Sequence, residues 1–134
     1  MNFTYNVITR EKGRYLEIVN AQIPLETEQQ ALDLMSLCVE NETNLLMVHA
    51  PAISENFFRL STGAAGGILQ KLINYHITAA FVLNEEMVLP QRFQEMMLEA
   101  NKGGQYRFYS TTSEAEQWLL SSQEKQEYES AHNL

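Results

Sequence analysis

The sequence contains a single cysteine, Cys38, only three prolines, and nine basic residues against seventeen acidic ones. A lone cysteine excludes an internal disulfide, which is typical of a protein in a reducing cytoplasm. The formal net charge of −8 disfavours nucleic acid and anionic membranes as partners, because both repel an acidic chain. No apolar run is long enough to cross a bilayer, and residues 1–6 lack the regions of a signal peptide. We therefore expect a cytoplasmic protein.

Motifs that would identify an enzyme are also missing. Gly63, Gly66 and Gly67 match neither the dinucleotide-binding fingerprint nor the phosphate loop with its lysine. No histidine has a second ligand at metal-binding spacing, so we expect neither a metal nor a cofactor. Cys38 falls on the inward side of a predicted helix, where an inert core thiol is favoured over a nucleophile. The sequence leaves catalysis undecided and favours its absence.

The hydrophobic pattern predicts a single small α/β domain. With 134 residues, 45% hydrophobic and 19% charged, the chain can bury a core of its own. Alternating or continuous apolar segments predict the order β-β-α-β-α-β-α-β-α, with strands at 5–8, 14–19, 45–48, 77–83 and 106–109 and helices beginning near 27, 62, 90 and 113. This order predicts a mostly parallel sheet of four to five strands, with an N-terminal antiparallel hairpin turning at Lys12 and Gly13.

The polarity of the chain changes near its C-terminal end. Residues 1–121 carry the apolar periodicity and are predicted to form the domain. Residues 122–134 are polar all round, which predicts a tail that frays or that extends the last helix into solvent.

Hydroxyl and small side chains gather where a loop enters the helix predicted over 62–75. Ser61, Thr62 and Gly63 stand at its start, and Thr62 is favoured as a plain helix N-cap, whose removal costs about 1 kcal/mol. The alternative is an anion site, or a phosphorylated Thr62, at the positive end of the helix. Arg59 is placed one turn earlier to meet such an anion.

Two adjacent glycines inside the same helix need an explanation. Gly66 and Gly67 each cost about 1 kcal/mol relative to alanine. Such a cost is understandable where another backbone or a partner packs closely, and internal packing and an intermolecular contact are equally compatible with the sequence. A separate candidate is His49, which ends a predicted buried strand. With Asn84 and Ser110 it would lie at the carboxyl ends of the strands, where small α/β sheets bind ligands.

Several segments resemble, over nearly the full length of the chain, the bacterial family called domain of unknown function 4180. They are Ala31–Met35, Ile53–Phe58, Thr62 with Ala65 and Gly66, Ile68–Lys71, Ile73–Tyr75 and Glu99–Gly103. Membership of this family implies no activity. The chain departs from the family pattern at Arg59 and Gly67, where acidic residues are usual, which argues against a polar site that needs those acids.

The element order is also similar to that of STAS domains, found in sulfate transporters and anti-sigma-factor antagonists. Those domains carry an Asp-Ser-Ser-Gly loop at a helix start, with the phosphorylated serine just before the glycine. Leu60–Gly63 lies at the matching place. The resemblance implies a STAS-like fold with Thr62 at the phosphorylation site, although Leu60 replaces the aspartate.

The sequence favours a non-enzymatic protein-interaction or regulatory module that acts through residues 59–75. The expected partner is another protein or a second copy of the chain, which includes a purely structural homodimer. The alternative is a small-molecule or anion binder, or an enzyme, with a pocket at the carboxyl ends of the strands. The candidate binding residues are Arg59, Ser61, Thr62, Gly63, Gly66, Gly67 and His49.

Overall fold

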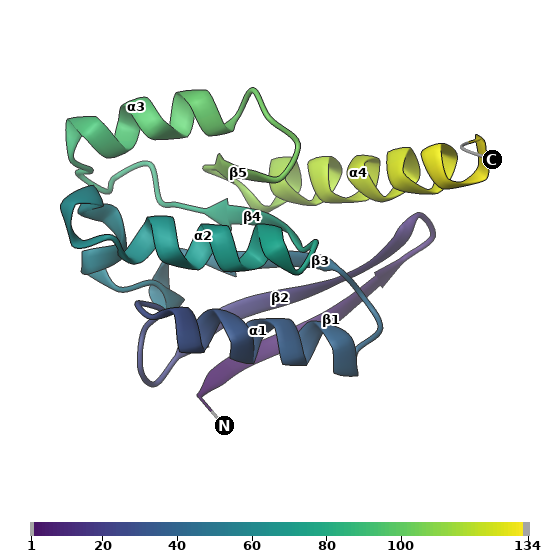
Figure 1. The fold of residues 1–134 in the computed structure, drawn as a ribbon, viewed down its shortest axis with the longest axis horizontal. Helices are drawn as coiled ribbons and strands as arrows, with labels where there is room; N and C mark the ends of the chain where they lie inside the picture. Colours follow the sequence, from purple (N-terminus) through teal and green to yellow (C-terminus); the bar gives the residue numbers. More distant parts are fainter. Residues whose placement is uncertain (1, 133–134) are drawn as a thin grey trace.

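The computed structural model describes residues 2–132, and the side chains of residues 2–123. The five strands are β1 Phe3–Arg10, β2 Gly13–Ala21, β3 Leu45–His49, β4 Thr78–Val82 and β5 Tyr106–Tyr109. The helices are α1 Glu28–Glu40, α2 Ala64–Asn74, α3 Gln91–Ala100 and α4 Thr112–His132 (Figure 1). Three short 3₁₀ turns lie between β3 and α2: η1 Ala50–Ala52, η2 Glu55–Phe58 and η3 Leu60–Thr62. The predicted α/β class and element order are confirmed.

All five strands form one sheet in the order β1-β2-β3-β4-β5. The first two strands pair antiparallel, and the remaining pairs are parallel, as the sequence predicts. Ligand sites of open α/β sheets lie where the strand order reverses, because two crossovers diverge there and leave a crevice. In this sheet each strand lies next to its neighbour in sequence, so the parallel part has no such reversal. Any binding site therefore depends on loops and helix ends.

The helices cover the two faces of the sheet unequally. Right-handed crossovers between successive neighbouring strands place α1, α2 and α3 on the same face, which faces the viewer in Figure 1. Leu34, Ile68 and Phe93 from these three helices belong to one large buried cluster. The opposite face packs Met47 of β3 against Leu119 of α4 in a second cluster. Strands β3 and β4 are therefore buried on both sides, which explains their continuous apolar sequence.

Five phenylalanine rings form the centre of the larger core at its β4–β5 side. They are Phe57, Phe58, Phe81, Phe93 and Phe108. The ring centroids of Phe58 and Phe93 are 5.1 Å apart in an edge-to-face arrangement, and those of Phe81 and Phe108 are 5.1 Å apart and stacked. Such pairs contribute about 0.5–1.5 kcal/mol beyond the burial of their area. The cluster ties η2 and α3 to the sheet.

A carboxylate fastens α4 to the β1–β2 hairpin. Glu116 Oε1 accepts hydrogen bonds from the Tyr15 hydroxyl and from Arg10 Nε, each at 2.8 Å. Partial burial raises the pKa of Glu116, but the hydrogen bonds from Tyr15 and Arg10 outweigh it and hold the pKa below its ordinary value. Burial and the neighbouring carboxylate raise the pKa of Tyr15. Glu116 is therefore ionised at neutral pH, and Tyr15 keeps its proton to donate.

This arrangement predicts a loss of stability in acid. Because the pKa of Glu116 is lower in the folded state, its stabilising contribution is complete above the unfolded pKa and is lost as the pH falls through the folded one. We expect the free energy of unfolding to fall more steeply between about pH 5 and pH 3 in the wild type than in Glu116→Gln. Urea unfolding across this range measures it, and parallel curves for the two proteins would contradict the assignment.

The remaining elements agree with the sequence in most places. Thr27 is the N-cap of α1, and its side chain accepts a hydrogen bond from Gln30 N. Pro90, predicted as the first helical residue, instead occupies the N-cap position of α3, because its fixed φ also suits an extended residue at a helix entrance. Cys38 is 1% exposed, and burial raises the pKa of its thiol to about 12. It is an inert core residue, as predicted.

Helix α4 continues beyond the predicted end of the domain. It runs to His132 and extends past the hairpin end of the sheet (Figure 1), and residues 133–134 lie outside the described residues. The division of the chain at residue 121 stays a prediction. Within the part of the chain that the structure describes, no helix has both the length and the apolar character needed to span a membrane.

Candidate functional site

The predicted surface over residues 59–75 includes an open corner where the amino ends of α1 and α2 meet. A cavity of about 420 Å³ lies there; its lining residues are Glu26, Thr27, Glu28, Asn56, Thr62, Gly63 and Ala64. We call it the α1–α2 cavity. Ser61, Thr62 and Gly63 are all exposed. The corner is therefore accessible from outside the molecule.

The predicted role of Thr62 as the N-cap of α2 is wrong. The N-cap is Gly63, with a φ of 77° and no capping side chain, a conformation that glycine adopts without strain. Thr62 Oγ1 instead lies 2.8 Å from the carbonyl oxygens of both Asn56 and Arg59, and accepts from Ala64 N at 3.2 Å. The hydroxyl thus closes the η3 turn before the helix begins. Phosphorylation of Thr62 stays a prediction.

The cavity is acidic, which the sequence reasoning missed. Glu26 Oε1 accepts hydrogen bonds from Ser54 Oγ at 2.8 Å and Asn56 Nδ2 at 2.6 Å. These hydrogen bonds lower the pKa of Glu26, so it is ionised, and Glu28 adds a second carboxylate to the same cavity. An anion here meets like charges, whereas a cation is attracted. In the sequence, the glutamates on either side of Thr27 indicated that this helix start is acidic.

The two helical glycines have different surroundings. A Cβ built on Gly67 would lie 3.0 Å from Cγ of Glu28, so the absence of a side chain lets α2 approach α1 closely. A Cβ on Gly66 would have nothing within 4 Å, and this residue is exposed. Gly67 therefore serves internal packing, and Gly66 is exposed on the first turn of α2, the helix that begins at the α1–α2 cavity.

His49 lies apart from this corner. Its Nε2 is 2.8 Å from Glu17 Oε2, and Glu17 Oε1 accepts from Asn6 Nδ2 at 3.4 Å. Because Glu17 pairs in register with Met47, these polar groups lie on the α4 face of the sheet, away from α2. His49 does not line the α1–α2 cavity or either of the two cavities described below, and neither do the predicted partners Asn84 and Ser110. The structure therefore does not bring His49 together with Thr62.

A different set of residues forms a cavity at the carboxyl ends of β3 and β4. It measures about 420 Å³ and is lined by Ile53, Glu55, Phe58, Arg59, Met87, Val88, Leu89 and Pro90. We call it the β3–β4 edge cavity. Of the predicted residues, only Arg59 belongs to it. The loop before α3 supplies half of its lining, and no spacing in the sequence pairs that loop with η2.

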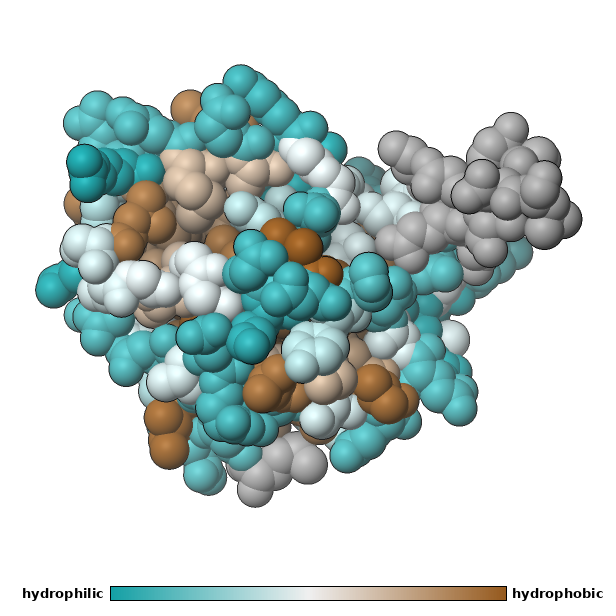
Figure 2. Space-filling view, viewed as in Figure 1, coloured by the Kyte–Doolittle hydropathy of each residue, from teal (hydrophilic) through white to brown (hydrophobic). Residues whose placement is uncertain are grey.

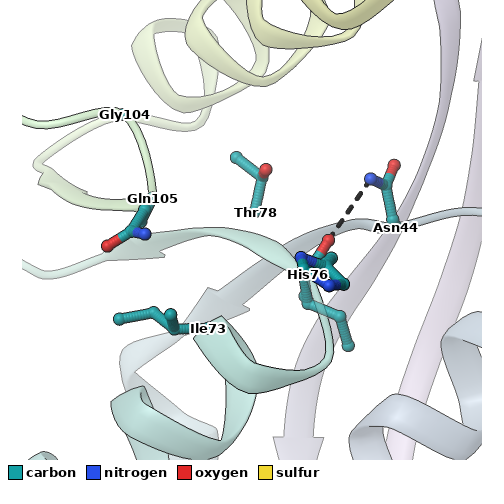
Figure 3. A pocket seen from close by; sticks show the side chains of 7 residues that line it. Asn44, Ile73, His76, Thr78, Gly104 and Gln105 are labelled. Carbon is teal, nitrogen blue, oxygen red and sulfur yellow. Dashed lines mark hydrogen bonds between the residues drawn. The ribbon is translucent and has the colours of Figure 1, made fainter.

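A third cavity, of about 280 Å³, lies at the amino ends of β3, β4 and β5 and is shown in Figure 3. Asn44 Nδ2 donates to the carbonyl oxygen of His76 at 3.3 Å, and His76 has a positive φ of 59°. This hydrogen bond holds the turn between α2 and β4. Within the described residues, no group of three or more His, Cys, Asp or Glu is placed to hold a metal ion.

Comparison with known proteins assigns the chain no activity. A family model described as "Domain of unknown function (DUF4180)" matches residues 10–119. The match covers most of the chain, including the α1–α2 cavity and the β3–β4 edge cavity. No curated protein and no solved structure matches the chain. A relation to STAS domains is therefore not shown.

Proposed function

The chain belongs to the DUF4180 family, and we propose that it is a non-enzymatic protein-interaction module with a regulatory role, acting through the surface of residues 59–75. The observation that carries this proposal is the open α1–α2 cavity together with the exposed Gly66 on the first turn of α2. Exposed backbone at the start of a helix offers amide groups and a flat approach to another chain. Because Gly66 has no side chain, the surface of a partner approaches the helix backbone closely here.

Charge indicates the kind of partner. Glu26 and Glu28 line the cavity, and the whole chain carries −8. A partner that places a lysine or arginine in the cavity gains a charge-assisted hydrogen bond. Complementary charge also speeds association and makes it sensitive to salt. We expect a basic patch on the partner, and weaker binding at high ionic strength.

The chemistry of the described side chains supports binding rather than catalysis. Cys38, the only thiol, is buried with a raised pKa, which suppresses the thiolate that a nucleophile requires. His49 is held by Glu17 at 2.8 Å on the other face of the sheet. Neither group lies at the α1–α2 cavity.

Substitution of Gly66 by leucine tests the proposal. A Cβ at Gly66 meets nothing within 4 Å on an exposed position, and leucine favours a helix over glycine, so the variant should fold. Immobilised wild type and Gly66→Leu are compared for proteins captured from a lysate of the source organism, and each captured protein is then purified and titrated. We expect affinity for the true partner to fall at least about tenfold.

Gly104→Leu is the matched control, because Gly104 also has nothing within 4 Å of a built Cβ. It lies just before β5, at the amino ends of the strands, and does not line the α1–α2 cavity. This control should bind like the wild type. If the partner is a second copy of the chain, sedimentation velocity over a range of concentrations shows a dimer that Gly66→Leu alone weakens. Equal behaviour of all three proteins in both assays would overturn the proposal.

A further inference from the structure

The β3–β4 edge cavity combines an apolar floor with two opposite charges. Ile53 and Phe58, from the β3–α2 connection, are 7% and 6% exposed and provide the floor. Across the cavity, Met87, Val88 and Leu89 come from the loop that precedes α3. Figure 2 shows hydrophobic surface between α3 and α2 on the face that these helices cover. An apolar group placed in the cavity contacts both walls.

Val88 makes this cavity unusual for a water-facing surface. The residue is 98% exposed, although Met87 and Leu89 on either side are half-buried. A ligand that covers Val88 removes apolar surface from water, which favours binding. The volume of about 420 Å³ falls within the range of about 300–1,000 Å³ that is usual for small-molecule sites.

The two charges in the cavity are not satisfied by each other. Glu55 and Arg59 both line it, yet neither forms an ion pair or a side-chain hydrogen bond with any side chain that the structure describes. The local backbone explains this. Glu55 begins the η2 turn, and Arg59 follows its end in an extended conformation, so the two do not stack as i and i+4 residues do on an α-helix. Both residues are exposed and line the cavity, so one acceptor and one donor border the same space.

We propose that the β3–β4 edge cavity binds a free α-amino acid with an apolar side chain. The guanidinium of Arg59 binds the α-carboxylate, the carboxylate of Glu55 binds the α-ammonium, and the apolar side chain lies against Phe58 and Val88. A guanidinium suits a carboxylate because its parallel N–H groups match the two oxygens. A zwitterion is also neutral, so the net charge of −8 does not repel it. This site is independent of the α1–α2 cavity.

Calorimetric titration of the full chain with leucine and its analogues tests each contact. Leucine is expected to bind, while glycine, which lacks the side chain, binds at least about tenfold more weakly. Leucinamide lacks the carboxylate, and N-acetylleucine lacks the ammonium, so each should also lose at least about tenfold. Methionine and phenylalanine are titrated alongside leucine to cover the apolar class.

Two variants assign the charges. Arg59→Gln should weaken leucine at least about tenfold but leave the already weak leucinamide nearly unchanged, and Glu55→Gln should do the same for leucine and N-acetylleucine. Arg92→Gln is the control, because Arg92 is exposed on α3 and does not line the cavity. Thermal unfolding verifies that each variant is folded.

The outcomes separate this inference from the proposed function. Gly66→Leu should bind leucine like the wild type, whatever it does to a protein partner. No binding of leucine, methionine or phenylalanine up to about 10 mM would overturn the proposal, since weaker binding has no use at cellular concentrations. So would equal affinity for leucine and both analogues, or binding of a leucine-containing peptide with none of the free amino acids.

Discussion

Replacement of Phe93 by alanine is expected to lower the free energy of unfolding by about 3–5 kcal/mol. Phe93 is 0% exposed, and its ring centroid lies 5.1 Å from that of Phe58 and 5.5 Å from that of Phe108. Alanine removes the ring and leaves a cavity between α3 and the sheet, which the rigid aromatic neighbours cannot fill. Urea unfolding followed by circular dichroism measures the change.

Leu98→Ala is the matched control, since Leu98 lies on the same helix and is 69% exposed. Its substitution should change stability by less than about 0.5 kcal/mol. A loss at Phe93 as small as that at Leu98 would mean that α3 is not packed on the aromatic cluster. The β3–β4 edge cavity would then lack its second wall.

Gln30→Ala is expected to cost about 1–3 kcal/mol, because it removes the hydrogen-bond partner of four partly buried backbone groups. Gln30 is 8% exposed. Its Oε1 accepts from the backbone N–H groups of Glu26 and Thr27 at 2.8 and 3.0 Å. Its Nε2 donates to the carbonyl oxygens of Ile23 and Pro24 at 2.9 and 3.0 Å. One side chain thus shapes the whole turn that carries Glu26 to the α1–α2 cavity.

Gln29→Ala controls for the change in helix propensity at the next position. Gln29 is exposed, and its Nε2 donates a long hydrogen bond of 3.5 Å to Asp33 Oδ1. Its substitution should be neutral within about 0.5 kcal/mol. Chemical denaturation of both variants decides the matter, and an equally small effect of the two would show that the turn holds its shape without Gln30.

The elements that the sequence predicted best are those specified by neighbours along the chain. Helix α1 begins after Thr27, because a threonine cap followed three residues later by Gln30 satisfies the first N–H groups locally. The three-residue spacing of Phe93 and Met96 indicates α3 by itself, because a helix brings every third or fourth residue to one face.

Thr62 shows where local reasoning fails. A hydroxyl before a glycine at a helix start predicts an N-cap, but the carbonyl oxygens of Asn56 and Arg59 compete for the same side chain. That competition depends on how η2 folds back over η3. Gly67 is a similar case, since the position of Glu28 on a different helix decides that its missing side chain serves internal packing.

The candidate site depends on contacts between distant segments. Glu26 meets Ser54 and Asn56 across 28 and 30 residues of chain, and His49 meets Glu17 across 32. No spacing rule connects such positions, because their distance is set by strand order and by the path of each crossover. The β3–β4 edge cavity likewise requires η2 and the loop before α3 to lie side by side.

By itself, the order of apolar and polar residues determined the α/β class, the N-terminal hairpin, the buried central strands and an inert Cys38, because periodicity and burial are properties of each segment. Only the tertiary structure decided which carboxylates share a cavity, which glycine faces open space and which charges are left without partners. Those features arise from the distance between segments that the chain brings together only when it folds.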